Sequence, residues 1–345
     1  MDRVAEPART LGAAAGKNAT VTTPSPIGEF DLIARWFRPP VRRARLGGGD
    51  DCALLAPEPG TDTAVSTDLL VEGRHFLSTV DPEALGHKAL AVNLSDLAAC
   101  GATPRSFLLA LALPAVDAGF LEGFSRGLLA LADAHGCELV GGDTTRGPLT
   151  IGITVFGAVP TGTALLRSGA RVGDEVWASG TLGDARLALE VFRGTVALPG
   201  DAFAAVRRRM ERPTPRVALG ERLRGIATAA IDVSDGLSGD LRHVLAASSV
   251  GATLDVDALP TGRELGEQVP ERRRRFALAG GDDYELCFTA PAARRDDVAR
   301  AAASADVAVT RIGRVEAEPG LRLVDRAGDR VDGLDAAGFD HFLAP

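Results

Sequence analysis

The chain has 345 residues and a mass of 35.7 kDa, which is enough for two domains and at least one large hydrophobic core. Apolar residues make up 46% and charged residues 24%, a composition typical of globular proteins. The net charge is -8 and the pI is near 5.3. No excess of positive charge is available to replace phosphate counterions, which excludes a non-specific binder of DNA or RNA.

Membrane and secreted proteins are also disfavoured. No apolar run approaches the ~20 residues that a transmembrane helix needs, and the N-terminus lacks the basic flank and apolar segment of a secretory signal. The cysteines Cys52, Cys100, Cys137 and Cys287 are scattered and form no C-x-x-C pair. We therefore expect reduced, mostly buried thiols in a cytoplasmic protein, not a disulfide framework or a zinc site.

The N-terminal half of the chain predicts alternating helices and strands. Residues 1–26 lack hydrophobic periodicity and are expected to form a disordered extension. Apolar spacing then predicts a helix from Gly28 to the proline pair Pro39-Pro40. A short strand is expected at residues 63–68. The Asp81-Pro82 pair is typical of a helix start, and that helix should run to about Cys100.

Three further elements are predicted before Pro160, where the pattern of the sequence changes slightly. A helix is expected from Asp117 to His135, because Gly136 follows it as a C-terminal cap. A strand at 137–140 should end at Gly141-Gly142-Asp143, and β-branched residues predict another strand at 150–159. We place the domain boundary near Pro160.

The boundary gives an N-terminal domain of residues 27–160 and a C-terminal domain of residues 161–345. In the second domain, strands are expected at 174–179, 229–232, 284–289 and 307–315, and helices at 184–192, 216–224 and from 236 to about 247. This mixed order favours α/β and α+β domains over the strict alternation of a Rossmann fold.

Aspartates at the ends of the predicted elements are the most informative feature of the sequence. Several follow glycines or end strands: Asp50-Asp51, Asp68, Asp143, Asp232 with Asp235, and Asp282-Asp283. Neighbouring carboxylates repel each other, so this placement is costly unless a cation holds them. Mg²⁺ prefers oxygen ligands and is usually held by one or two carboxylates together with substrate phosphates. The pattern as a whole predicts a metal and phosphate site, although a single Asp-Gly cluster is more often a simple turn.

Asp96 supports this prediction, because it falls in the apolar stripe of the helix that begins at Pro82. A carboxylate buried there needs a cation or hydrogen bonds, and Asn93 is the expected hydrogen-bond partner. The alternative is a local polar kink near the helix end. His75 follows the Asp68 strand, but a lone histidine is more often structural than functional.

The sequence resembles the thiamine-monophosphate kinase family, within the wider aminoimidazole ribonucleotide synthetase-like superfamily. The strings that carry the resemblance occur in the family's order: GEFDLIARWF, GGGDDCALL, VSTDLLVEGRHF, KALAVNLSDLAACGA, LVGGDTTRGP, LLRSGARVGD, IDVSDGLSGDL, GGDDYELCF and GFDHF. They extend from Gly28 to the C-terminus and leave out only the N-terminal tail. Other superfamily members share the acid-rich ATP site but not this set of strings.

The resemblance implies an enzyme that transfers the γ-phosphoryl group of ATP, directly and in line, to thiamine monophosphate. The products are thiamine diphosphate and ADP, and several Mg²⁺ ions are the implied cofactor. The implied fold has an N-terminal domain that forms a homodimer through its sheet and an α+β C-terminal domain, with both substrates in the cleft between them. Neither nucleic acid nor membrane is an expected partner.

Roles for individual residues also follow from the resemblance. The implied magnesium ligands are Asp51, Ser66, Thr67, Asp68, Asp96, Asp143, Asp232 and Asp235; the implied ATP contacts are Gly142, Asp143, Arg167 and Ser234; and the implied substrate contacts are His75, Asp282 and Phe339. No catalytic base is implied. Family members commonly have Glu at the position of Asp282, so the carboxylate is one methylene shorter here, and a bridging water would restore its reach.

Two alternatives remain open from the sequence. One is another ATP-dependent enzyme of the superfamily that acts on a different phosphate or amide. The other is a non-catalytic nucleotide-binding protein that has kept the fold, which the retained acids of the matched strings disfavour.

Overall fold

The structure is a computed structural model that describes residues 28–49 and 52–334. The predicted extension at residues 1–26 and the candidate site residues Asp51 and Phe339 lie outside these ranges. None of the helices in the described ranges is long and apolar enough to span a membrane.

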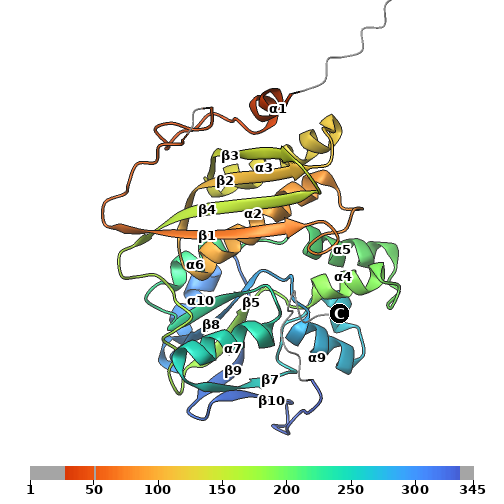
Figure 1. The fold of residues 1–345 in the computed structure, drawn as a ribbon. Helices are drawn as coiled ribbons and strands as arrows, with labels where there is room; N and C mark the ends of the chain where they lie inside the picture. The colour runs from red at the N-terminus through yellow and green to blue at the C-terminus, as the bar shows by residue number, and fades with distance from the viewer. Residues whose placement is uncertain (1–27, 50–51, 335–345) are drawn as a thin grey trace, which may run out of the picture.

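The N-terminal part of the chain forms a four-stranded sheet whose one face is covered by two helices (Figure 1). The strand order is β1-β4-β2-β3, in which β2 and β3 are parallel and the other pairs are antiparallel. The elements are α1 (Glu29–Trp36), β1 (Thr61–Val71), α2 (Pro82–Ala99), β2 (Thr103–Leu113), α3 (Ala118–His135), β3 (Glu138–Arg146) and β4 (Thr150–Pro160).

Local signals explain why α2 and α3 begin and end where they do. The backbone amides of Glu83 and Ala84 donate to Asp81 Oδ1 at 2.9 and 3.2 Å, which caps the first turn of α2. Asp117 caps α3 in the same way, and Gly136 ends it with a φ of 58° in the left-handed region. The predicted bounds of both helices are therefore confirmed to within a residue or two.

The C-terminal part forms a six-stranded sheet in the order β10-β7-β9-β5-β8-β6, with helices around it (Figure 1). Its elements are β5 (Glu175–Ser179), α4 (Asp184–Phe192), α5 (Gly200–Glu211), α6 (Val217–Leu223), β6 (Ala229–Val233), α7 (Leu237–Ser248), β7 (Gly251–Asp255), α8 (Arg263–Gly266), α9 (Pro270–Ala279), β8 (Glu285–Ala290), the 3-10 turn η1 (Ala292–Arg294), α10 (Arg295–Ser304), β9 (Val309–Glu316) and β10 (Gly320–Val324). The predicted mixture of α/β and α+β architecture is confirmed.

Helix α2 is the element that joins the two sheets. It packs on β1, β2 and β4 of the first sheet and on α6, β6 and β8 of the second part. The main hydrophobic core accordingly contains residues from both parts, such as Leu90 of α2 and Phe288 of β8, which are fully buried. The core is therefore continuous across the segment near Pro160.

Several elements differ from the sequence-based expectations. Strand β3 does not end at Gly141-Gly142-Asp143 but continues to Arg146, because β2 pairs with it in parallel and aligns Ala110 with Asp143. The strands β2, β7 and β10 and the helices α5, α8, α9 and α10 were not predicted. Strand β2 has apolar residues on both of its faces, so it lacks the alternation that marks a half-exposed strand.

The expectation of mostly buried cysteines is only half correct. All four thiols are free; Cys137 and Cys287 are buried, Cys100 is half-buried, and Cys52 is exposed. Burial raises the pKa of the Cys137 thiol to about 12, which keeps it protonated and unreactive at neutral pH.

The close approach of α2 and α3 generates the first prediction. A Cβ atom at Gly86 would lie 2.0 Å from the backbone oxygen of Phe124, so Gly86→Ala should lower the free energy of unfolding by about 2 kcal/mol despite alanine's better helix propensity. Urea unfolding measures this. The control is Gly200→Ala, at the first position of α5, where a Cβ meets open space and stability should not fall. Equal stabilities of the two variants would contradict the helix contact.

Candidate active site

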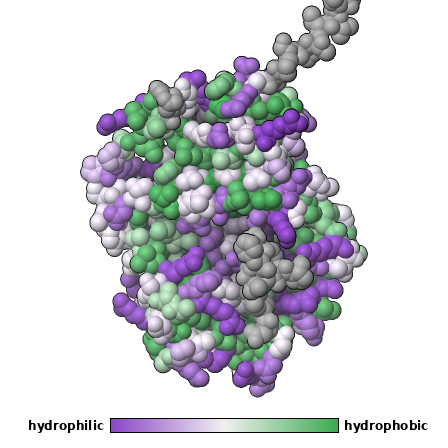
Figure 2. Space-filling view, viewed as in Figure 1, coloured by the Kyte–Doolittle hydropathy of each residue, from purple (hydrophilic) through white to green (hydrophobic). Residues whose placement is uncertain are grey.

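A cavity of ≈ 1210 Å³ lies between the two parts of the fold. Its walls come from the end of β1 and the turn after it, from α2, and from α4, α5 and the β6–α7 and α9–β8 connections. Figure 2 shows hydrophilic surface gathered where these two parts meet. The predicted site residues that line the cavity are Thr67, Asp68, His75, Asp96, Asp232, Ser234, Asp235 and Asp282.

Four carboxylates form one side of this cavity, and we call Asp68, Asp96, Asp232 and Asp235 the carboxylate cluster. Asp68 lies near the end of β1, Asp96 in the last turn of α2, and Asp232 near the end of β6, while Asp235 follows in the turn before α7. Acids that are far apart in the sequence are thus brought together by the ends of three elements. This is the convergence that their positions at strand and helix ends predict.

Serine hydroxyls hold two of these carboxylates in place. Ser66 Oγ donates to Asp96 Oδ2, and Ser95 Oγ donates to Asp232 Oδ2 at 2.8 Å. The predicted hydrogen bond from Asn93 to Asp96 is wrong. Asn93 instead accepts from the backbone amide of Asp68 at 3.1 Å and donates to the Ala89 carbonyl, because its side chain turns toward β1 and back along the helix.

The carboxylate cluster is electrostatically unfavourable without a cation. Burial, followed by the charges of Asp96 and Asp235, raises the pKa of Asp68 to about 7. Burial also raises the pKa of Asp96 and of Asp232, and the charge of Asp96 raises that of Asp232 further. The Ser66 hydrogen bond and the nearby charge of Arg167 oppose the shift at Asp96. Like charges in a partly buried space favour a bound cation.

The donor set fits a magnesium ion. Within residues 28–49 and 52–334, no three His, Cys, Asp or Glu side chains are arranged to hold a metal ion by themselves. Mg²⁺ does not need such a group, since it commonly takes one or two carboxylates and completes its shell with water and substrate phosphates. Asp51, a further predicted ligand, lies outside the described residues.

The predicted ATP contacts are only partly brought to the cavity. Ser234 lines it, whereas Gly142 and Asp143 are exposed on β3 and Arg167 is exposed in the connection after β4. The conformation at Gly142 requires glycine, since a Cβ there would lie 1.9 Å from the Leu109 carbonyl oxygen. The Arg167 guanidinium lies close enough to lower the pKa of Asp96, so it borders the carboxylate cluster.

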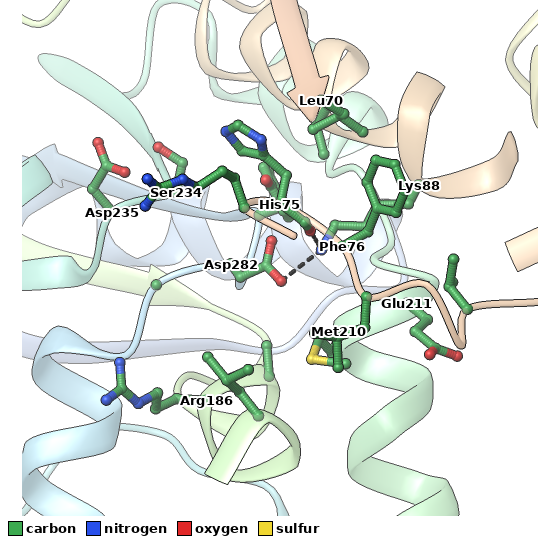
Figure 3. Close-up of a pocket in the computed structure, with 18 of the residues that line it drawn as sticks. Leu70, His75, Phe76, Lys88, Arg186, Met210, Glu211, Ser234, Asp235 and Asp282 are labelled. Atoms are coloured by element: carbon green, nitrogen blue, oxygen red, sulfur yellow. Dashed lines mark hydrogen bonds and ion pairs between the residues drawn. The ribbon is translucent and has the colours of Figure 1, made fainter. Parts of the chain in front are cut away.

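The predicted substrate contacts lie at another part of the wall (Figure 3). His75 Nδ1 accepts from the backbone amide of Val71 at 2.9 Å, which fixes the ring in the turn after β1. Asp282 lies in the α9–β8 connection and forms an ion pair with Lys88 of α2. Phe339 lies outside the described residues.

Several wall residues were not singled out by sequence reasoning: Lys88, Arg186, Met210, Glu211 and Tyr284. The sequence did contain a signal for Lys88. It lies three positions after Leu85 and four before Val92, so helical spacing places it on the same helix face as Asp96. The other four lie on α4, on α5 or beside β8, and only tertiary packing brings them to the cavity.

Comparison with known proteins identifies close relatives. Family models described as AIR synthase related protein, N-terminal domain, and AIR synthase related protein, C-terminal domain, match residues 49–159 and 171–326. The chain is 49% identical over 327 residues to the thiamine-monophosphate kinase of Salmonella typhimurium, covering 92% of this chain and 99% of that relative. It is 48% identical over 327 residues to the Escherichia coli K12 protein of the same name, with the same coverage.

Solved structures of similar proteins share the fold. The crystal structure of thiamine-monophosphate kinase from Stenotrophomonas maltophilia K279a has a TM-score of 0.78 at 46% identity and covers 84% of this chain and 92% of that chain. A structure described as AaThiL complexed with AMPPCP and TMP has a TM-score of 0.73 at 32% identity, covering 83% and 89%.

The raised pKa of Asp68 predicts a pH-dependent effect of its replacement in chelator-treated protein. A folded-state pKa near 7 means that the stability linked to this group is present below its unfolded value of about 3.9 and is lost as pH rises through 7. Asp68→Asn, which mimics the protonated form, should therefore stabilise the fold by about 2 kcal/mol at pH 8 and have little effect at pH 4.

Urea unfolding at the two pH values measures this difference. The control is Asp62→Asn, at an exposed position of the same strand, which should keep the wild-type pH dependence. An Asp68→Asn effect of the same size at pH 4 and pH 8 would contradict the raised pKa.

Proposed function

The chain belongs to the thiamine-monophosphate kinase family of AIR synthase related proteins, and on this basis we propose that it transfers the γ-phosphoryl group of ATP to thiamine monophosphate. The products are thiamine diphosphate and ADP. The observation that carries the proposal is the 49% identity to the Salmonella typhimurium enzyme over 99% of that enzyme's length. The cavity of ≈ 1210 Å³ supports it, since small-molecule pockets of roughly 300–1,000 Å³ are usual and two substrates need more room.

Magnesium is the cofactor that the carboxylate cluster fits. Asp68, Asp96 and Asp232 offer hard oxygen ligands, and no Lys or Arg within the described residues forms an ion pair with them. The full set of proposed ligands is Asp51, Ser66, Thr67, Asp68, Asp96, Asp143, Asp232 and Asp235. When bound, the ions supply neutralisation of the phosphate charges.

The chain's own residues act by positioning the two substrates for direct, in-line transfer. The acceptor phosphate is largely ionised at neutral pH because the second pKa of such a group is about 6, so no general base is needed. Arg167 can bind a phosphate with two parallel hydrogen bonds. The proposed ATP contacts are Gly142, Asp143, Arg167 and Ser234, and the proposed contacts to thiamine monophosphate are His75, Asp282 and Phe339.

The uncovered face of the four-stranded sheet supports a homodimer. Helices α2 and α3 lie behind this sheet in Figure 1, and Figure 2 shows hydrophobic residues over its opposite face. Val65 and Leu69 of the edge strand β1 are each 58% exposed there, and exposed large apolar side chains that gather on one face indicate an interaction surface. Val65 pairs with Phe156 of β4, and Leu69 pairs with Gly152, which in turn pairs with Ala110 of β2. A second copy of the chain would cover this apolar face.

We place the reaction in the cytoplasm. The free thiols support a reducing compartment, and Cys52 is exposed without a disulfide partner among the described residues.

An assay of ADP release tests the function. Wild-type protein should release ADP only when ATP, thiamine monophosphate and Mg²⁺ are all present, and EDTA should abolish release because the phosphates would lose their counterions. Asp68→Asn and Asp143→Asn should each lower turnover by about 100-fold or more, whereas Asp62→Asn should not. Circular dichroism checks that the variants are folded.

Three other results would count against the proposal. Preference for a different acceptor would assign the chain to another activity of the superfamily. Nucleotide binding without ADP release that depends on thiamine monophosphate would indicate a non-catalytic protein. Near-normal turnover of both aspartate variants would contradict the metal-ligand assignment.

Val65→Arg tests the homodimer, because a charged side chain on the apolar face would be desolvated on association. Light scattering coupled to size-exclusion chromatography should show wild-type protein as a dimer and this variant as a monomer at micromolar concentration. Val172→Arg, at a position that is 60% exposed but away from the sheet, should remain a dimer. A monomeric wild-type protein would contradict the proposal.

A further inference from the structure

Lys88 has no role in the proposed function, yet it is the most completely buried cation near the cavity. Its side chain is only 2% exposed in the middle of α2, and an ammonium group in such a place is costly unless it is compensated. Of the 38 Lys and Arg residues in the chain, only Lys17 and Lys88 are lysines. A lysine at this buried position, in a chain with only one other lysine, indicates a need for a compact charge on a flexible aliphatic side chain.

The two partners of Lys88 come from the two segments that carry proposed substrate contacts. Its Nζ atom lies 2.6 Å from Asp282 Oδ2 and 3.3 Å from the backbone oxygen of His75. Asp282 belongs to the α9–β8 connection, and His75 to the turn after β1, so these segments approach each other from the two parts of the fold. Figure 3 shows Lys88 meeting Asp282 with His75 beside them. One ammonium group thus ties both segments together.

The backbone around Asp282 needs such support. Asp282 and Tyr284 have φ values of 63° and 52°, in the left-handed region that residues other than glycine rarely adopt. Hydrogen bonds from their amides to the carbonyls of Ser234 (2.7 Å) and Val233 (2.8 Å) hold the main chain of the loop. They do not fix the direction of the Asp282 side chain, whereas the ion pair with Lys88 does.

The Asp282 carboxylate and the Lys88 ammonium differ in how far they are exposed to the cavity. Both residues line the cavity, but the Asp282 side chain is 34% exposed and the Lys88 side chain only 2%. A bound molecule therefore meets mainly the carboxylate. The influence of Lys88 on a ligand passes mainly through Asp282 and the His75 turn.

We propose that Lys88 is a positioning residue that sets the affinity for thiamine monophosphate by holding Asp282 and the His75 turn in fixed relation to each other. This inference rests on the proposed function and adds a residue to it. It also predicts selectivity between the substrates, since neither hydrogen-bond partner of the Lys88 ammonium is a proposed ATP contact.

Steady-state kinetics of Lys88 variants test the proposal. Lys88→Met keeps an unbranched side chain of similar length but removes the charge, so it should raise the KM for thiamine monophosphate about tenfold or more while the KM for ATP changes less than about twofold. Lys88→Arg keeps the charge with a wider head group and should give a smaller increase than Lys88→Met. The control is Arg126→Met, which removes the cation of a surface ion pair with Glu83 and should change neither KM.

The double variant Lys88→Met/Asp282→Asn removes both charges of the pair together, so neither is left without its partner and the risk of misfolding is lower. If the pair acts as a unit, its KM for thiamine monophosphate should be no higher than that of the worse single variant. An unchanged KM for thiamine monophosphate in the Lys88 variants, or equal increases in both KM values, would overturn the proposal. So would fully additive effects in the double variant.

A measurement on the wild-type protein is independent of any variant. With ¹³C-labelled lysine, the chain gives signals from only Lys17 and Lys88. Addition of thiamine monophosphate should shift the Cε signal of Lys88 and leave that of Lys17 in place, and an unmoved Lys88 signal at saturation would overturn the proposal. Failure of the proposed function is recognised separately, since wild-type protein would then release no ADP with thiamine monophosphate.

Discussion

The structure depends on one constraint, which is that the polar side chains buried along α2 must find partners on other elements. A buried polar group without a partner costs several times what a typical hydrogen bond contributes. In α2 each one is satisfied by a residue of another element, and two of these partners lie on β1. Lys88 bonds to Asp282 and the His75 carbonyl, Asn93 to the amide of Asp68, Ser95 to Asp232, and Asp96 to Ser66. These bonds set where β1, β6 and the α9–β8 connection lie around the helix, and therefore where the cavity walls lie.

A second buried network, of ion pairs and hydrogen bonds, supports the part of the cavity wall that α5 forms. Glu285 of β8 is fully buried and forms ion pairs with Arg209 of α5 and Arg216 at the start of α6, at 2.8 and 2.6 Å. Ser179 Oγ donates to the same carboxylate at 2.6 Å. Because α5 also carries the wall residue Met210, the network connects the second sheet to the cavity lining. Removing one partner of such a network leaves an uncompensated buried charge, so its members act together.

Sequence reasoning predicted the features that local chemistry determines. The caps at Asp81 and Gly136 gave the bounds of α2 and α3, and the acids at element ends gave the side of the cavity where Asp68, Asp96 and Asp232 meet. It could not find β2 or the length of β3, because these depend on pairing between distant strands. The partner of Asp96 was assigned to Asn93 because neighbours on one helix are visible in a sequence. The actual partner, Ser66, is 30 positions away and only the folded chain brings it near.

The two ends of the cavity differ in whether their carboxylates have a cation of the chain beside them. At the end near α5 and the α9–β8 connection, each wall carboxylate has a cation of the chain beside it: Asp282 pairs with Lys88, and Glu211 with Arg207. At the other end the carboxylates of Asp96 and Asp232 accept hydrogen bonds from serine hydroxyls, Asp68, Asp96 and Asp232 form no ion pair with Lys or Arg among the described residues, and burial raises the pKa of all three. The first end is therefore organised before any ligand arrives, whereas the second is completed only by a cation from solution. A net charge of -8 is thus compatible with binding phosphates, because part of the acidic excess is placed where metal ions would reverse its sign.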